Sequence, residues 1–119
     1  MLKMYGLKNY DTVKKARRFL QQHHVEVQFH DYRLDGVDAA LLQRFISTLG
    51  YKALLNTRGT SWRKLESVRR DSINDADSAL AVMLEQPALI KRPLLCADNG
   101  AMLSGFDQQH YMQFIAENS

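Results

Sequence analysis

The stretch from Tyr5 to Arg18 constrains the fold more than any other part of the sequence. Gly6 breaks a short apolar run, and three residues follow whose side-chain oxygens can accept from the first N–H groups of a helix: Asn9, Asp11 and Thr12. Apolar residues then recur at helical spacing, at Val13, Ala16, Phe19 and Leu20. The pattern predicts the end of a strand, a loop and the start of a helix, whose free N–H donors suit an anion.

Apolar patterning in the rest of the chain predicts the remaining elements. Two strands are expected at Leu2–Tyr5 and Val25–Phe29, and a hairpin over 94–104 with a tight turn at Asn99–Gly100. Helices are expected from Asp11 to about His23, from an Asp38 cap to Gly50, over Ser61–Leu65, from Asn74 to about Gln86 with Ala76, Ala79, Leu80 and Met83 inward, and after an Asp107 cap. This order predicts one α/β domain over residues 1–119. Its fold is thioredoxin-like, with a four-stranded mixed sheet and a helical insertion between the second and third strands.

Length and composition are those of an ordinary globular protein, with 119 residues, 45% hydrophobic and 24% charged. No apolar run approaches a membrane span, and the first residues do not resemble a signal peptide, so a cytoplasmic protein without membrane contact is expected. The single cysteine, Cys96, excludes an intramolecular disulfide and lies in an apolar run, where an inert core thiol is expected. The four histidines lack metal-ligand spacing, and His30 is expected to face outward on its strand.

The formal net charge of +3 is concentrated near the amino terminus, where residues 1–35 hold seven Lys and Arg against four Asp and Glu. One interpretation is a solvated helix face, and the other is an electropositive rim that binds a small anion. Nucleic acid is not expected to bind directly, because the basic patch is short and lacks interleaved aromatic residues.

Three segments together resemble the ArsC/Spx family, and the YffB-like branch most closely. The first is the run Y-G-L-K-N-Y-D-T-V-K-K-A-R-R from Tyr5 to Arg18, and the second is the Arg92–Pro93 pair before a strand. The third is the segment from Asn56 to Leu65, whose Thr57-Arg58 and Lys64-Leu65 resemble Spx and YffB proteins. The family's reactive cysteine corresponds to Tyr10 in this chain.

The resemblance implies a thioredoxin fold and a reductase linked to glutathione or glutaredoxin. It implies a cis Arg92–Pro93 bond, with Arg92 beside the start of the first helix, where it contacts an oxyanion or thiol adduct. The site residues that it implies are Asn9, Tyr10, Thr12, Val13, Lys14, Arg58, Arg92 and Pro93. Arginines that arsenate reductases carry near Asn56 and Gly105 are absent, so arsenate is a doubtful substrate.

Tyr10 leaves two classes of function open. A phenol is neutral near pH 7 and cannot form the mixed disulfides of thiol reductases, so the family's thiol catalysis is expected to be missing. The alternative is a binding or regulatory module. Such a module would bind a small anion such as glutathione, or dock on a protein partner as Spx docks on RNA polymerase. No cofactor or metal is expected, apart from glutathione as a ligand or co-substrate.

Overall fold

A computed structural model describes residues 2–118. The chain divides into two compact units, one formed by residues 2–36 and 92–118 and the other by residues 37–91. We call them the sheet unit and the helical unit. The prediction of one domain over 1–119 stays a prediction. Among residues 2–118, no helix has the length and apolar character that crossing a membrane requires.

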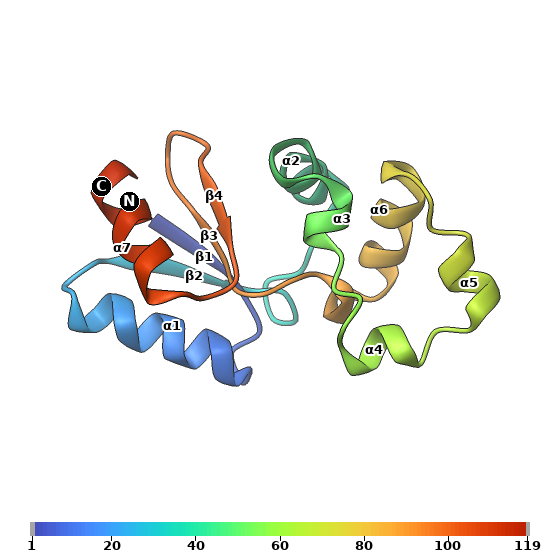
Figure 1. Ribbon diagram of the computed structural model, residues 1–119, viewed down its shortest axis with the longest axis horizontal. Helices are drawn as coiled ribbons and strands as arrows, with labels where there is room; N and C mark the ends of the chain where they lie inside the picture. Colours follow the sequence, from blue (N-terminus) through green and yellow to red (C-terminus); the bar gives the residue numbers. More distant parts are fainter. Residues whose placement is uncertain (1, 119) are drawn as a thin grey trace. The chain divides into compact units, whose positions relative to one another are not determined.

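The sheet unit is built on four strands: β1 (Leu2–Gly6), β2 (Val27–Asp31), β3 (Leu94–Cys96) and β4 (Met102–Ser104). Their order across the sheet is β2-β1-β3-β4 (Figure 1). The β1 strand is internal and pairs parallel with β2 and antiparallel with β3. The mixed four-stranded sheet and the central place of the first strand are confirmed.

Two helices pack on one face of this sheet, α1 (Asp11–Gln22) and α7 (Gln108–Asn118) (Figure 1). The core between them and the sheet consists of buried side chains from all these elements: Leu2, Met4, Val13, Ala16, Phe19, Leu20, Leu95, Tyr111 and Phe114. The predicted Asp107 cap of α7 is confirmed, since its carboxylate accepts from the His110 N–H at 3.0 Å. Burial of the apolar stripe of α1 therefore fixes the helix that carries the opening motif.

The boundary between α1 and β2 differs from the prediction. The helix ends at Gln22, in agreement with the predicted end at about His23, but His24 then takes a left-handed conformation with φ of 56°. The Val25 N–H then donates back to the Leu20 carbonyl at 2.9 Å. Because Val25 closes the end of the helix in this way, it does not join the strand, which begins at Val27 and continues to Asp31.

The hairpin between β3 and β4 is confirmed, but its turn is not the tight two-residue turn predicted at Asn99–Gly100. The Ala97 N–H donates to the Ala101 carbonyl, which closes a three-residue loop. Gly100 has φ of 93°, whereas a primed two-residue turn would also need positive φ at Asn99, which has none. The glycine thus supplies the left-handed position of a longer loop.

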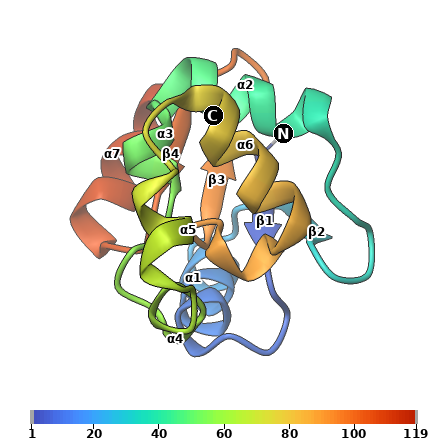
Figure 2. The same ribbon diagram turned by 90° about the vertical axis from the view of Figure 1, so that its right-hand side faces the viewer.

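The helical unit contains five helices and a 3-10 turn within residues 37–91 (Figure 2). They are α2 (Ala39–Leu49), α3 (Tyr51–Leu54), α4 (Thr60–Arg63), α5 (Ser67–Asp71), α6 (Ala76–Glu85) and η1 (Pro87–Leu89). The predicted start and stop of α2 are confirmed. The Asp38 carboxylate accepts from the Leu41 N–H, and Gly50 follows the helix with φ of 83°.

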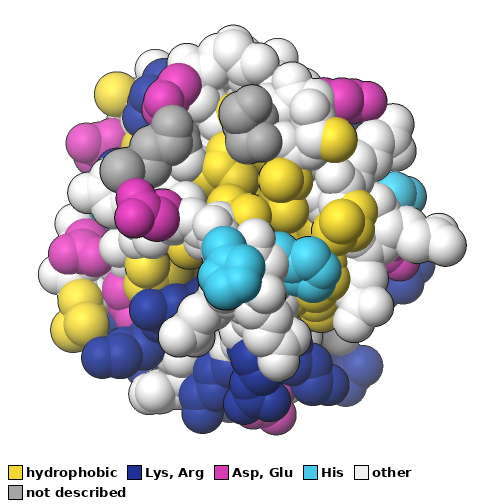
Figure 3. Space-filling view, turned by 90° about the vertical axis from the view of Figure 1, so that its left-hand side faces the viewer, with side chains coloured by type: hydrophobic (Ala, Val, Ile, Leu, Met, Phe, Trp, Pro, Cys, Tyr) yellow, Lys and Arg dark blue, Asp and Glu magenta, His cyan; other side chains and the backbone are white. Residues whose placement is uncertain are grey.

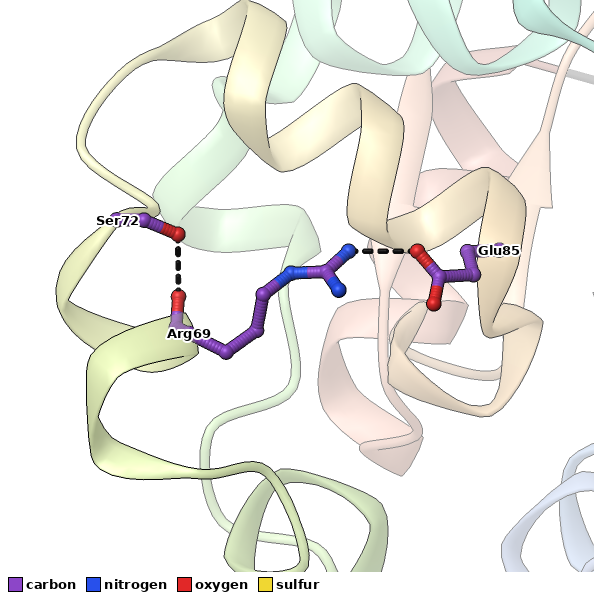
Figure 4. A network of polar contacts seen from close by, with 3 residues as sticks. All are labelled: Arg69, Ser72 and Glu85. Atoms are coloured by element: carbon purple, nitrogen blue, oxygen red, sulfur yellow. Dashed lines mark hydrogen bonds and ion pairs between the residues drawn. The ribbon is translucent and has the colours of Figure 1, made fainter.

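Two details of the helical unit correct the sequence-based expectations. The helix predicted from Asn74 begins at Ala76, because Asp75 and Ser78 form a reciprocal capping box. Ala76 is then exposed and Val82 is buried in its place. The other detail is α5, which was not predicted. Its Arg69 bonds Glu85 of α6 at 2.6 Å, and the Ser72 hydroxyl donates to the Arg69 carbonyl (Figure 4).

Candidate functional site

A cavity of about 340 Å³ lies at the carboxyl end of β1, within the sheet unit. It is lined by the loop before α1, by the residues that end and follow β2, and by one residue that precedes β3: Leu7, Lys8, Asn9, Tyr10, Asp31, Arg33, Leu34 and Arg92. Open α/β sheets bind ligands at the carboxyl ends of their strands, so the cavity lies where a site is expected.

The loop that borders this cavity is a turn that leads directly into α1. The Tyr10 N–H donates to the Leu7 carbonyl at 3.1 Å, and Tyr10 occupies the N-cap position in an extended conformation. Its side chain makes no capping hydrogen bond. The first intrahelical bond runs from the Lys14 N–H to the Tyr10 carbonyl at 3.0 Å. The N–H groups of residues 11–13 precede that bond and face the space beyond the helix start.

Arg92 and Tyr10 form the closest contact between charged and aromatic groups in this cavity. The guanidinium carbon of Arg92 lies 4.4 Å from the centroid of the Tyr10 ring, the distance of a cation–π interaction. The Arg92–Pro93 bond is cis, as predicted. Partial burial lowers the pKa of the Arg92 guanidinium, while Tyr10 and Tyr32 act in the opposite direction. An arginine remains charged at neutral pH despite such a shift.

Gly6 permits the close approach that brings these groups together. A Cβ built on Gly6 would lie 2.9 Å from a methyl carbon of Val13 and 3.7 Å from the Cβ of Arg92. Val13 is fully buried, so its side chain has little room to move away. The end of β1 and the first turn of α1 approach this closely because residue 6 has no side chain, and the Cβ of Arg92 lies beside them at an ordinary contact distance.

Asp31 organises the opposite wall of the cavity. Its carboxylate accepts from the N–H groups of Lys8 at 2.9 Å, Arg33 at 2.7 Å and Leu34 at 3.2 Å. Burial of this residue, which is 5% exposed, opposes ionisation, but the three N–H donors outweigh that effect and hold the pKa below its ordinary value. One buried carboxylate thus ties the loop of Lys8 to the segment that follows β2.

Tyr32 lies under this wall and is almost completely buried, at 2% exposed. Its ring stacks on Tyr5, with centroids 6.5 Å apart. Burial raises the pKa of the phenol well above its ordinary value, so the hydroxyl is protonated. That hydroxyl has no hydrogen-bond partner among residues 2–118.

The charge of the cavity is predominantly positive. Three cationic side chains line it, those of Lys8, Arg33 and Arg92, against the single carboxylate of Asp31. The Asp31 oxygens are already occupied by backbone donors, which offsets their charge locally. The cavity is therefore suited to an anionic ligand, and its aromatic and guanidinium surfaces can contact the apolar parts of that ligand.

The structure brings three of the predicted site residues into the cavity, namely Asn9, Tyr10 and Arg92. The others lie elsewhere in their units. Thr12 and Val13 are in the first turn of α1, Lys14 is exposed on that helix, Pro93 is buried, and Arg58 is exposed in the helical unit. Their roles as ligand-binding residues stay predictions.

Five lining residues were not predicted from the sequence: the apolar Leu7 and Leu34, and the polar Lys8, Asp31 and Arg33. Lys8 lies inside the motif of residues 5–18, but a lysine in a polar loop is typical of any protein surface and does not by itself indicate a site. Asp31 and Arg33 belong to a turn-rich link, where an aspartate followed by polar residues is read as a turn former. Asp31 connects the two walls of the cavity because its carboxylate accepts from the N–H of Lys8, which lies 23 residues earlier in the sequence.

Two expectations about side-chain burial are corrected. Cys96 is half-buried rather than a core thiol, because β3 ends there while Leu94 and Leu95 are fully buried. His30 is half-buried rather than facing outward. Its ring lies 5.0 Å from that of Tyr5, and its Nε2 is 2.7 Å from the Gly36 carbonyl. Within the part of the chain that the structure describes, no three His, Cys, Asp or Glu side chains form a group that could hold a metal ion.

Comparison with known proteins identifies the family. The model of the ArsC family matches residues 5–114, which is nearly the whole chain. The chain belongs to the ArsC family. The match spans both units, so the helical segment is part of the ArsC fold and not a separate addition.

Individual ArsC relatives agree with this assignment. An uncharacterised protein of Haemophilus influenzae is 41% identical over 116 residues, which is 98% of this chain and the whole of that protein. The solved structure of a YffB protein is 39% identical and superimposes with a TM-score of 0.89, covering 95% of this chain and 97% of the other. An ArsC-related protein from Brucella melitensis is 43% identical with a TM-score of 0.77, covering 96% and 93% of the two chains. These structures confirm the thioredoxin-like fold.

Proposed function

We propose that this ArsC-family chain binds a small organic anion of the glutathione class and does not perform thiol catalysis. The observation that carries the proposal is the cation–π contact in which the Arg92 guanidinium carbon lies 4.4 Å from the centroid of the Tyr10 ring, inside a cavity lined by two further cations. The contact with the ring holds the guanidinium in the cavity, where N–H donors of this group can pair with a carboxylate of the ligand.

The charged and polar groups of glutathione match those that line the cavity. It carries two carboxylates and an extended peptide backbone, which match the cations and the N–H groups at the start of α1. Lys8 and Arg33 stand on exposed segments and can each pair with a carboxylate. Support also comes from the family, since solved relatives include an arsenate reductase related protein that is 43% identical and a possible arsenate reductase that is 25% identical.

Tyr10 is the reason to propose binding without catalysis. By resemblance it occupies the position of the family's reactive cysteine, and a phenol cannot form or resolve a disulfide. The chain's one thiol, Cys96, lies on β3 and does not line the cavity. Binding of the ligand would then serve a regulatory or carrier role.

The first test is a titration of glutathione, and of its diethyl ester, into the protein by calorimetry and amide NMR. We expect shifts in the loop of residues 7–10, and a loss of about tenfold or more in affinity when the carboxylates are esterified. Arg92→Met should weaken binding by a similar factor, whereas Lys52→Met, an exposed change in the helical unit, should leave it unchanged. Binding that is insensitive to Arg92→Met would overturn the proposed site.

The second test measures turnover of a glutathione mixed disulfide and of arsenate by the wild-type protein. We expect rates equal to buffer. Turnover well above buffer would contradict the non-catalytic part of the proposal and restore the enzyme interpretation. The Cys96→Ser variant would then show whether that thiol carries the reaction.

A further inference from the structure

The outer edge of β2 is open at its amino-terminal half. The Tyr32 N–H donates inward to the Gly6 carbonyl, while the N–H and carbonyl of Asp31 both bond Asp35, at 2.9 and 2.8 Å. Backbone groups alternate along a strand, so those of Val27 and Phe29 point outward like those of Asp31. No other strand within residues 2–118 pairs with this edge.

A row of cations lies along the same edge. Lys14, Arg17 and Arg18 of α1 line a hollow of about 530 Å³ together with Gln21, Val25 and Val27. Figure 3 shows Lys and Arg side chains gathered on the lower part of the molecule, where α1 runs in Figure 1. None of these three cations forms an ion pair with a described residue. The carboxylates nearest to these cations in the sequence are those of Asp11 at the start of α1 and Glu26 before β2.

Arg17 connects the cation row with the strand. Its guanidinium carbon lies 4.5 Å from the centroid of the Phe29 ring, which belongs to the open part of β2. Phe29 and Val27 are partly buried against the core, so an apolar row lies between the cations and the strand backbone. A ligand bound at this edge would contact three adjacent surfaces: the backbone donors and acceptors of β2, the apolar side chains of Val27 and Phe29, and the cations of α1.

We infer that the β2 edge beside α1 is a docking site for an extended acidic peptide segment of a protein partner. The segment adds a strand to the sheet by bonding the outward N–H and carbonyl groups of Val27 and Phe29. Its alternate side chains are carboxylates, which contact Lys14, Arg17 and Arg18. Asp35 occupies the edge at Asp31 and so limits the added strand to the open half.

Charge selects this occupant over two others. A second copy of the chain pairing edge to edge would bring two rows of cations together, which costs free energy. A nucleic acid would satisfy the cations but has no strand backbone to bond Val27 and Phe29. The docking site shares no lining residue with the Tyr10–Arg92 cavity, so either site can fail without the other.

The test uses a short capped peptide that alternates Glu and Val, titrated into the isotope-labelled full-length protein at low salt. We expect amide shifts concentrated at Val27, Gln28 and Phe29. Two changed peptides serve as controls, one with N-methylated valines, which cannot pair as a strand, and one with Lys in place of Glu. Both should bind at least about tenfold more weakly.

Protein variants separate the two contributions. Lys14→Glu with Arg18→Glu changes exposed side chains only and should weaken the peptide by about tenfold or more, whereas Lys52→Glu with Lys64→Glu in the helical unit should not. Val27→Pro removes one outward N–H at a position where an edge strand tolerates proline, and should also weaken binding.

Three results would overturn the inference. One is equal binding of the N-methylated peptide, which would show adsorption by charge alone. Another is tighter binding of a DNA or RNA oligonucleotide without shifts in β2. The last is a concentration-dependent dimer, detected by sedimentation, whose β2 amides shift in the absence of peptide.

Discussion

The sheet unit and the helical unit both bury apolar side chains, but among residues 2–118 the buried charged side chain, that of Asp31, belongs to the sheet unit. In the helical unit the fully buried side chains are aliphatic or aromatic: Leu42, Phe45, Leu54, Ala79, Val82, Met83, Leu89 and Ile90. In the sheet unit, Asp31 is buried with Tyr32 and Tyr111, and Arg92 is half-buried. The two units therefore differ in the types of residue that form their cores.

This difference indicates that buried apolar side chains mainly stabilise the fold, whereas the buried polar groups support the candidate site. A buried polar group costs free energy unless it is hydrogen-bonded, so it persists where it supports a particular local geometry. Asp31 meets that condition with three N–H donors, and it holds the walls of the cavity.

The chain also supplies one native probe in each unit, Trp62 in the helical unit and Cys96 in the sheet unit. Changes in the two units can thus be followed separately.

The largest effect is expected in the apolar unit. Leu42 of α2 is fully buried, and Leu42→Ala should reduce the free energy of unfolding by about 2–5 kcal/mol through lost burial and a cavity. Urea unfolding followed by Trp62 fluorescence measures it. Leu84→Ala, at a side chain 37% exposed, is the matched control and should cost much less. Equal costs at the two positions would contradict a packed core in this unit.

A smaller effect with a different pH dependence is expected for the polar unit. Asp31→Asn removes an acceptor and should cost about 1–3 kcal/mol at neutral pH. Because the Asp31 pKa is lowered on folding, its contribution is present above the unfolded value of about 4 and is lost as the pH falls through the folded value. The gap between wild type and variant should therefore close in acid. If the difference in urea midpoint between wild type and Asp31→Asn did not change with pH, the ionised carboxylate would not be the cause of the stability difference.

The third prediction concerns the start of α1. Tyr10→Cys places a thiol beside free N–H donors and Arg92, which stabilise a thiolate, so its apparent pKa should fall below ~7.5 from the free value of ~8.5. Iodoacetamide reactivity titrated against pH measures this, as does formation of a glutathione mixed disulfide. Wild type, whose one thiol is the half-buried Cys96 on β3 and not at a helix start, should react more slowly than the variant. A variant thiol that titrates near the free value would mean that the scaffold does not activate this position.

The smallest effect is expected at the surface link between α5 and α6. The hydrogen bond from Arg69 lowers the pKa of the Glu85 carboxyl (Figure 4). Both side chains are solvent-exposed. Exposed ion pairs contribute little to stability, so Glu85→Gln should leave the urea midpoint almost unchanged. A large loss would indicate that α5 depends on this single contact.

Local signals sufficed for much of the fold. The strand–loop–helix of residues 2–22, the Asp38 and Asp107 caps and the hairpin over 94–104 each depend on neighbours in sequence. The short helix α5 was missed because five residues cannot form a stable helix without tertiary contacts. Val25 was misassigned because an apolar residue after a helix fits both a strand and the closing hydrogen bond that it makes.

The candidate site was predicted only where it lies inside a local motif. Asn9, Tyr10 and Arg92 line the cavity as predicted, and the family resemblance led us to expect Arg92 beside the start of α1, but not its contact with the Tyr10 ring. Asp31 was not found, because its carboxylate acts on a loop 23 residues away and no periodicity encodes that distance. Arg33 was missed for a different reason: its N–H donates to Asp31 only two residues earlier, so the segment has the sequence pattern of an ordinary surface turn.

Gly6 has a consequence for how homologous sequences should be interpreted. Any larger residue at this position would collide with Val13, so selection for the packed fold alone should keep glycine there. An alignment would then show an invariant residue next to the motif even in relatives that have changed ligand or lost activity. Invariance at position 6 should accordingly be discounted as a marker of shared chemistry, and variation at Tyr10 and Arg33 examined instead.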